Sequence, residues 1–414
     1  MRNVFDQYDQ PENRLTHALA CTLAEDRQQI RPFLRWLGIS EIPPLKDLRV
    51  LQQQVPGEIV SADDDEVRGL PDLCVFTDEG WCVLFESKVQ AKVTAGQLRR
   101  HLRTAQRHGY EKPFLVLISV ENATGVASTL AATRRWREVY AWFRSRSGKS
   151  EWATRLTEFM ETFESRMLAT GYDIRGTITM FDGLKFDHDN PYTYREGKRL
   201  IRLLGDQLRA RKELHRLGLD PARGGRSAIT GRRSDMVWDY LPLKVASGSS
   251  QFTHYPHLTI AIKRPHASAA VTVPNGVKGG FKSKLRRVGY DGFLDLLLTI
   301  EQNLRPIIRR SKDSQPVVYA TQRHYRTQSS DAVTDARLDV DLRTLAQTKS
   351  RVKQQPQWCR AIYEILANKR SNIQLGIEMR FSYKCPIVRS SEAVDLFSGA
   401  WIGMKPMLDF VLKK

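Results

Sequence analysis

The stretch GLPDLCVFTDEGWCVLFESKVQAKVTAGQLRRHL, residues 69–102, decides the fold of the first part of the chain. It contains two apolar runs, Leu70 to Phe76 and Trp81 to Val89, and the residues between them (TDEG) have the composition of a tight turn. The stretch is therefore predicted to form a β-hairpin. A helix is predicted to follow from Thr94.

The second strand of this hairpin carries two charged residues on one face. Side chains alternate along a strand, so Glu86 and Lys88 project to the same side as Leu84. Asp72 opens the partner strand, and a hairpin would bring it alongside Glu86. Two carboxylates and an ammonium at the ends of apolar strands are costly to bury unless something pairs with them.

A divalent cation would pair with these carboxylates. Oxygen ligands from Asp72, Glu86 and the Ser87 carbonyl suit Mg²⁺ or Mn²⁺. Such an ion would lower the pKa of a bound water and polarise a phosphoryl oxygen, while Lys88 orients that water or steadies the developing negative charge. The alternative is structural: Asp72 bonds backbone amides at a strand end, and Glu86 and Lys88 form a salt bridge on a solvated sheet face.

The pair Pro71-Asp72, followed by Glu86-Ser87-Lys88, resembles the PD-(D/E)XK nuclease superfamily, whose fold is the restriction-endonuclease-like core. The resemblance extends over about residues 10–125 through the order of the elements. It implies that the first part of the chain is a metal-dependent nuclease.

The same resemblance implies two further site residues. Many members have an acidic residue on the first helix that helps to bind the metal, and Glu12 matches that place; a glutamine after the lysine strand is common in several branches, and Gln97 matches it. Each has a local alternative. Gln97 with Thr94 fits a capping box, and Glu12 near a helix start is favoured by the helix dipole.

The elements around the hairpin indicate the fold class. Helices are predicted for residues 12–37 and 129–170, with a strand-like segment at 50–60 and a buried strand at 114–120. The order helix, strand, hairpin, helix, strand, helix is typical of an α/β or α+β protein with a mixed sheet flanked by helices.

Length and charge divide the chain into two parts. Its 414 residues favour two domains, which we place at 1–170 and 171–414, with the boundary between about 165 and 195. Residues 1–170 contain 23 basic and 23 acidic residues, so the whole excess of +19 lies in the second part. This asymmetry favours a polyanionic partner, although a basic surface that only aids solubility is the alternative.

The second part is predicted to be a basic α+β domain. Its strand-like pieces are residues 174–181, 258–262, 269–273, 338–342 and 375–383, and its helices lie near 196–217, 290–303 and 358–368. Glycine-rich basic loops near Phe281 and Tyr290 are expected to clamp a nucleic-acid backbone. The predicted nucleic-acid-binding residues are Arg232, Arg233, Lys278, Lys282, Lys284, Arg286 and Arg287.

The sequence therefore predicts a Mg²⁺-dependent endonuclease. A cytoplasmic location is expected, because the sequence has no apolar run of membrane-spanning length and no secretory signal. DNA is expected rather than RNA, in a bacterial defence or restriction role, with a homodimer or a partner protein of a defence system as possible assemblies. Two alternatives stay open: a non-catalytic nucleic-acid-binding or scaffold subunit, and an RNA-directed nuclease, since both nucleic acids present the same phosphates.

Overall fold

The structure is a computed structural model that describes Phe5 and residues 8–53, 70–90, 93–121, 130–170, 176–186, 194–225, 236–247, 249, 251–325, 332–345, 355–368 and 373–412. The chain forms two compact units, Met1–Met180 and Phe181–Lys414, each with its own hydrophobic core. The sequence places the boundary between about residues 165 and 195, with 170 as the working division, and the compact units divide after Met180. The two units are described separately below.

The first unit contains a mixed five-stranded sheet in the order β1-β2-β3-β4-β5. Neighbours β1, β2 and β3 pair antiparallel, and β3, β4 and β5 pair parallel. The strands are β1 (Arg49–Gln52), β2 (Leu73–Phe76), β3 (Cys82–Lys88), β4 (Phe114–Ser119) and β5 (Ala132–Arg135). The predicted hairpin is β2–β3, where Thr77 N–H donates to Trp81 O at 2.9 Å and Gly80 takes the left-handed conformation (φ 88°) that the turn requires.

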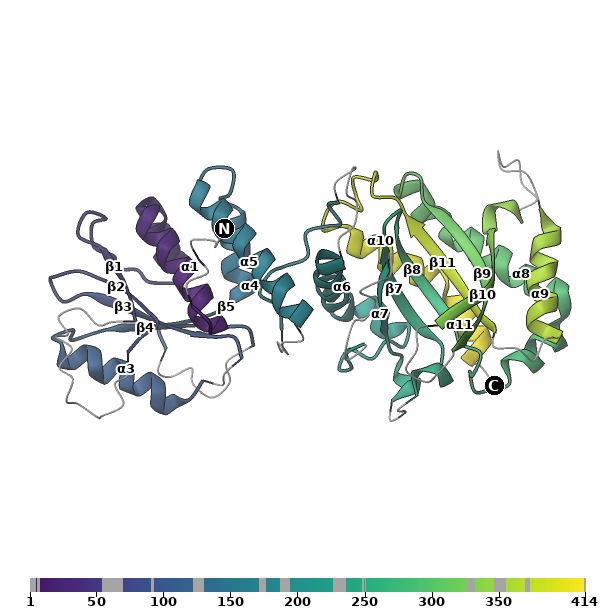
Figure 1. The fold of residues 1–414 in the computed structure, drawn as a ribbon, viewed down its shortest axis with the longest axis horizontal. Helices are drawn as coiled ribbons and strands as arrows, with labels where there is room; N and C mark the ends of the chain where they lie inside the picture. The colour runs from purple at the N-terminus through teal and green to yellow at the C-terminus, as the bar shows by residue number, and fades with distance from the viewer. Residues whose placement is uncertain are drawn as a thin grey trace. The chain divides into compact units, whose positions relative to one another are not determined.

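Helices cover both faces of this sheet (Figure 1). One face packs on α1 (Pro11–Glu25), α2 (Ile30–Trp36), α4 (Trp136–Arg144) and α5 (Glu151–Thr170), and the other packs on α3 (Ala95–Arg107). Phe85 of β3 belongs to the first core and stacks on Phe33, whereas Leu84 of β3 joins Leu98 of α3 in the second. The predicted α/β class with a mixed sheet and flanking helices is confirmed at this level.

Two predictions for the first unit are wrong. The single helix predicted over 12–37 is broken at Asp26, which has non-helical dihedrals and accepts hydrogen bonds from Gln29 and Ser150. The helix predicted from residue 129 begins only at Trp136, because residues 132–135 pair with β4 as the edge strand β5.

The predicted strand at 174–181 is also wrong for its described residues, which begin at Gly176. Glu164 of α5 accepts the backbone N–H of Ile178 at 2.6 Å and of Thr179 at 3.4 Å. These N–H groups are bonded to a carboxylate and not to a strand, so the segment is held as irregular chain.

The second unit contains a six-stranded sheet in the order β10-β9-β11-β8-β7-β6, and all neighbours pair antiparallel. The strands are β6 (Met236–Leu241), β7 (His257–Lys263), β8 (Ala267–Val273), β9 (Gln315–Tyr325), β10 (Ala332–Asp341) and β11 (Ile373–Phe381). The sequence predicts β7, β8, β10 and β11 and misses β6 and β9.

One face of this second sheet carries the core. Alternate strand residues such as Ile260, Val271 and Ile377 are fully buried in one cluster with the helices. The helices are α6 (Tyr194–Arg209), α7 (Lys212–Arg216), α8 (Phe281–Arg310), α9 (Pro356–Asn368), α10 (Ala393–Gly403) and α11 (Lys405–Leu412). The intervening strand residues, on the opposite face, are mostly polar.

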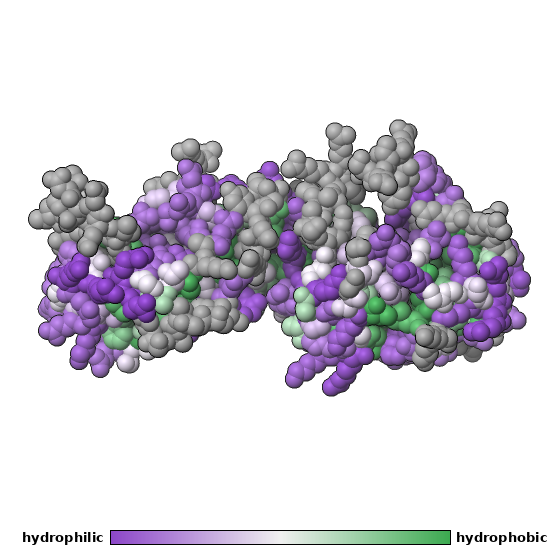
Figure 2. Space-filling model, turned by 90° about the horizontal axis from the view of Figure 1, so that it is seen from below, coloured by the Kyte–Doolittle hydropathy of each residue, from purple (hydrophilic) through white to green (hydrophobic). Residues whose placement is uncertain are grey.

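Short 3₁₀ helices complete the described structure at Arg27–Gln29, Lys244–Ala246, Phe252–His254 and Leu342–Thr344. Within the described ranges, no helix combines the length and the apolar composition needed to span a lipid bilayer. On the side seen in Figure 2, most of the surface is hydrophilic, and hydrophobic residues show only in limited areas.

Candidate active site

Asp72 lies directly beside Glu86, as the hairpin register requires. Leu73 pairs with Phe85 across β2 and β3, and Asp72 N–H donates to Phe85 O at 3.0 Å. The Asp72 carboxylate oxygen Oδ2 then accepts the backbone N–H of Ser87 at 2.7 Å. The carboxylate is therefore fixed across the end of the hairpin, next to the strand that carries Glu86 and Lys88.

The two charged residues of β3 face α3. Leu84 belongs to the core beneath α3, while Phe85 belongs to the core on the opposite side of the sheet. Because side chains alternate, Glu86 and Lys88 share the α3 face with Leu84. The sequence-based prediction for this face agrees with the structure.

Glu86 is buried, with a relative exposure of 1%, and both of its carboxylate oxygens are engaged. Its Oε1 atom lies 2.5 Å from Lys88 Nζ and accepts a hydrogen bond from Gln97 Nε2 at 2.6 Å. Its Oε2 atom lies 2.9 Å from His101 Nε2. A carboxylate in such a dry place needs this number of partners to offset its lost hydration.

The sequence predicts two roles for Gln97, a capping box with Thr94 and a place in the candidate site, and the structure shows half of the capping box together with a contact to Glu86. Thr94 Oγ1 accepts the backbone N–H of Gln97 at 3.2 Å, which is the first half of a capping box. The second half would need the Gln97 side chain to turn back to the helix start. It reaches Glu86 instead, so the cap positions α3 while the amide contacts the candidate site.

His101 is a site residue that the sequence reasoning missed. It follows Gln97 by four residues, so both side chains lie on the same face of α3, and His101 is 2% exposed. The sequence pattern that could indicate His101 is a glutamine and a histidine four residues apart on the helix after the Glu-x-Lys strand. A lone histidine on an apolar helix face gives no direction by itself.

The contacts shift the pKa values of the two acids in opposite directions. Burial and repulsion from Glu86 raise the pKa of Asp72 to about 6, although the Ser87 N–H and the charges of Lys88 and His101 oppose this shift. Burial would also raise the pKa of Glu86. Hydrogen bonds and charge from His101 and Lys88 outweigh that effect and hold the Glu86 pKa below its usual value.

Glu12 and Ser87, the other predicted metal ligands, flank this centre. Glu12, in the first turn of α1, accepts the N–H of Val89 at 3.3 Å and of Gln90 at 2.8 Å, so it fixes the chain just beyond Lys88. The Ser87 backbone contacts Asp72 through its N–H, while its side chain, by strand alternation, faces away from Glu86.

The donor set suits a hard divalent cation. Among the described residues, no group of three or more Asp, Glu, His or Cys side chains is arranged to hold a metal, so the fit rests on the Asp72 and Glu86 carboxylates. They are close enough for one to raise the pKa of the other. Mg²⁺ is commonly held by one or two carboxylates and keeps several of its waters, so these two residues fit Mg²⁺ or Mn²⁺.

The basic residues predicted to bind nucleic acid have a different setting from the one expected. Arg232 and Arg233 lie outside the described residues. Only Lys278 lies on a described loop. The other four, Lys282, Lys284, Arg286 and Arg287, lie in the first turns of α8. The prediction of a loop after residue 280 is wrong because Phe281 and Leu285, four residues apart, bury one face of a helix that Gly279 and Gly280 precede.

Two details limit how this basic segment can contact a ligand. Arg286 and Arg287 are exposed, whereas Lys284 is half-buried and its Nζ donates to Val411 O at 3.0 Å. Phe281 is buried against Phe410, so the prediction that it flanks a clamp on the surface is wrong. Tyr290 is half-buried and carries Arg360 over its ring.

Comparison with known proteins gives no relative. No protein-family model matches the chain, and neither a curated protein nor a solved structure matches it.

Proposed function

We propose that the first unit is a Mg²⁺-dependent nuclease of the PD-(D/E)XK superfamily, with a restriction-endonuclease-like fold, that hydrolyses phosphodiester bonds in DNA. One observation carries the proposal: Asp72 is fixed by the Ser87 N–H beside Glu86, and Lys88 lies 2.5 Å from that same glutamate. A structural role, in which Asp72 accepts the Ser87 N–H and Glu86 pairs with Lys88, would explain these contacts. It would give no reason to place Asp72, which is half-buried, where burial and its neighbour Glu86 raise its pKa to about 6.

Each residue has a role that follows from its contacts. Asp72 and Glu86 would hold the cation, which when bound supplies a water of lowered pKa and polarises the phosphoryl oxygen. Lys88 lies on the same face, where its ammonium can orient the attacking water and neutralise charge that develops on the phosphate. Its present partner, Glu86, keeps this ammonium at the centre.

Gln97 and His101 act through Glu86. Both belong to α3, and together they contact both oxygens of the Glu86 carboxylate. Such contacts fix the orientation of a metal-binding carboxylate, and their loss typically lowers metal affinity or activity by about 10-fold to 100-fold. They are therefore positioning residues in this proposal.

A nucleic acid is the proposed substrate, since the chain has an excess of 19 positive charges and the second part of the chain carries all of it. The choice of DNA over RNA rests on the resemblance to the superfamily. A role in bacterial defence or restriction is part of the same proposal and rests on the resemblance to the superfamily alone.

The test is cleavage of plasmid DNA by the full chain with Mg²⁺, beside Asp72→Ala, Glu86→Gln and Lys88→Met. Each substitution should lower the cleavage rate by about 100-fold or more. A parallel arm with single-stranded RNA distinguishes the two substrates. Chelation of the cation should abolish cleavage by the unsubstituted chain.

Matched controls are available in the same unit. Glu111 and Lys112 are exposed and lie before β4, so Glu111→Gln and Lys112→Met remove the same charges away from the site. These controls should cleave at the unsubstituted rate. If Glu86→Gln and Lys88→Met also do so, the proposed centre is wrong, and a purified chain that binds DNA but never cuts it favours the scaffold alternative.

A further inference from the structure

The polar face of the six-stranded sheet in the second unit is the starting point. On β7, Leu258, Ile260 and Ile262 enter the core, while Thr259 and Lys263 point to the other side. The same alternation runs through the neighbouring strands. It places side chains from β6, β7, β8, β9, β10 and β11 on one polar face, although they come from residues as far apart in sequence as 236 and 378.

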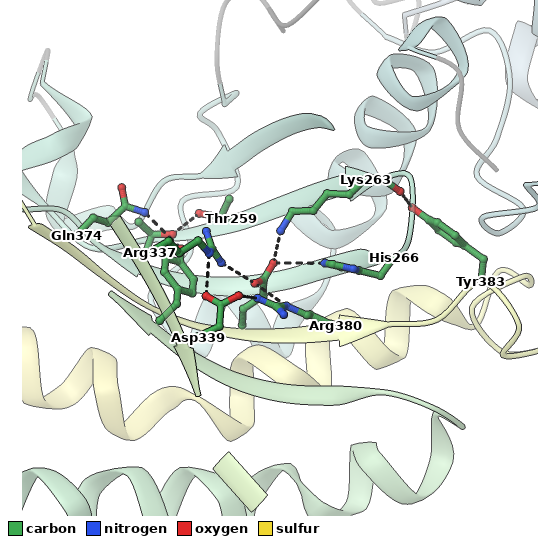
Figure 3. Close-up of polar contacts among 11 residues, drawn as sticks. Thr259, Lys263, His266, Arg337, Asp339, Gln374, Arg380 and Tyr383 are labelled. Atoms are coloured by element: carbon green, nitrogen blue, oxygen red, sulfur yellow. Dashed lines mark hydrogen bonds and ion pairs between the residues drawn. The ribbon is translucent and has the colours of Figure 1, made fainter. Parts of the chain in front are cut away.

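Basic side chains converge on one buried carboxylate at this face (Figure 3). Glu378 of β11 is 3% exposed; its Oε1 lies 2.7 Å from Lys263 Nζ, and its Oε2 accepts from Arg380 Nε at 3.1 Å and from Arg337 at 3.5 Å. Burial would raise the pKa of Glu378, but Lys263 and Arg380 lower it to about 2. Glu378 is therefore a charged anchor that holds the cations in place.

Tyr319 forms the floor on which one of these cations lies. Gly376 pairs directly with Tyr319 across β9 and β11, and a Cβ on this glycine would lie 2.2 Å from the tyrosine ring. The ring can lie flat across the strand only because the glycine has no side chain. The guanidinium of Arg337 then lies 4.3 Å from the ring centroid, which orients it along the polar face.

A pocket of about 180 Å³ lies over this face. Its charged lining residues are Lys263, Arg323 and Arg337 against the carboxylate of Glu378. Beside them, Asp339 pairs with Arg337 and with Arg380, so the whole group has four cations and two carboxylates, an excess of two positive charges. His257 also lines it, but burial lowers the pKa of His257 to about 4, so it is neutral at physiological pH. Hydroxyl groups of Thr259 and Thr272, 2.8 Å apart, add neutral hydrogen-bonding groups.

The size and charge of this pocket, called the anion pocket below, restrict its ligand. Pockets for drug-sized ligands have volumes of roughly 300–1,000 Å³, so a pocket of about 180 Å³ suits a smaller molecule. A phosphate monoester carries about −1.5 to −2 charges at neutral pH, which matches the excess of two better than a single carboxylate does. Arginine guanidinium groups also present paired donors in the geometry that phosphate oxygens accept.

We propose that the anion pocket binds the phosphate group of a small phosphorylated molecule, and that Lys263, Arg323 and Arg337 contact the phosphate oxygens. The rest of the ligand lies beside Trp238 and His257, which line the same pocket. This site is built only from residues of the second unit and does not rest on the proposed nuclease.

The first test is calorimetric titration of the full chain with inorganic phosphate, ribose 5-phosphate and acetate. The two phosphates should bind saturably with one site per chain, and their affinity should fall as salt is added, since screening weakens the attraction. Acetate, with one charge, should bind more weakly than either. Absence of saturable binding by both phosphates at millimolar concentration overturns the proposal, and so does equal binding of acetate.

The second test uses two substituted chains, one that keeps the buried anchor Glu378 and one that removes it together with a cation. Arg323 is half-exposed near the end of β9, and Arg323→Gln leaves Glu378 with Lys263, Arg337 and Arg380. Loss of one charge-assisted contact should weaken phosphate binding by about 10-fold or more. The double substitution Lys263→Met with Glu378→Gln removes a cation together with its partner, and the same loss is expected.

Two control variants show whether a loss of phosphate binding is specific to the anion pocket. Arg309 is exposed on α8 and does not line the pocket, so Arg309→Gln should bind phosphate as the unsubstituted chain does. Asp72→Ala should also bind normally, whatever its effect on cleavage. Unchanged binding by Arg323→Gln and by the double variant, both shown to be folded by circular dichroism, would refute the proposal.

Discussion

The substitution Asp72→Asn should make the first unit more stable at neutral pH while it removes nuclease activity. Asp72 accepts the Ser87 N–H through one oxygen, and an asparagine carbonyl can accept the same bond. What the substitution removes is a negative charge held beside Glu86 in a half-buried place. The folded chain bears the free-energy cost of ionising that acid, and the unfolded chain does not.

The size of this effect follows from the raised pKa. The Asp72 pKa moves from its ordinary value of 3.8 to about 6, which corresponds to about 3 kcal/mol at about 1.4 kcal/mol per pKa unit. In the unsubstituted chain, the pKa of Asp72 is higher in the folded state than in the unfolded state. The stability that Asp72 contributes is therefore fully present below about pH 4 and is lost as the pH rises to about 6. At pH 8, the free energy of unfolding of Asp72→Asn should therefore exceed that of the unsubstituted chain by up to about 3 kcal/mol. At about pH 4 the two chains should differ much less.

The assay is urea unfolding at about pH 4 and pH 8, read by pulsed hydrogen exchange of peptides that cover β2 and β3. These peptides report on the first unit alone. The matched control is Asp78→Asn, because Asp78 is exposed on the hairpin turn and pairs only at the surface with Arg49. Removing that pair should change stability by less than about 1 kcal/mol at either pH.

A divalent cation provides a second readout of the same reasoning. Mg²⁺ should stabilise the unsubstituted chain, by about 2.7 kcal/mol at a concentration 100 times its dissociation constant, and should stabilise Asp72→Asn much less. The reasoning is refuted if Asp72→Asn is no more stable than the unsubstituted chain at pH 8, or if its gain is the same at both pH values.

Three smaller predictions concern neighbouring residues. Thr94→Ala removes the cap of α3 and should lower stability by about 1 kcal/mol with cleavage nearly unchanged, whereas Gln97→Ala should lower the cleavage rate about 10-fold or more with little loss of stability. His101→Leu removes a partner that lowers the Glu86 pKa, so that pKa should rise, and carbon-detected NMR titration measures it. Gly376→Ala places a methyl group against a buried ring and should destabilise the second unit by about 1–3 kcal/mol in thermal unfolding, with weaker phosphate binding in calorimetry.

The centre in the first unit could be predicted from sequence because its main residues lie close together in the chain. The turn after Phe76 fixes the register of the hairpin, and the register then sets which side chains share a face. Local rules of this kind place Asp72 beside Glu86 without any knowledge of the tertiary fold. His101 needed the packing of α3 on the sheet, which alternation along β3 does not define.

The errors have a common physical origin, which is that tertiary contacts override local composition. Residues 132–135 form a strand because β4 offers them a free edge, and the helix over 12–37 breaks because Asp26 finds partners on other segments. Around Phe281, glycines on both sides suggest a loop, yet burial of its ring stabilises the helix. None of these partners is visible within a short window of sequence.

The anion pocket shows the same limit more strongly. Its charged residues lie on β7, β9, β10 and β11, and the antiparallel order of the sheet alone brings Lys263 and Arg337 to the same carboxylate. In the sequence, the charge excess favours only a polyanionic partner for this part of the chain, with a basic surface that aids solubility as the alternative. The structure divides that excess between exposed residues such as Arg286 and Arg287 and an enclosed group of cations around Glu378. Long-range attraction to exposed cations falls steeply with added salt, whereas buried hydrogen-bonded contacts are screened much less. Salt titration of DNA binding and of phosphate binding on the same preparation can therefore separate the two sets of cations, because DNA binding should weaken more steeply than phosphate binding.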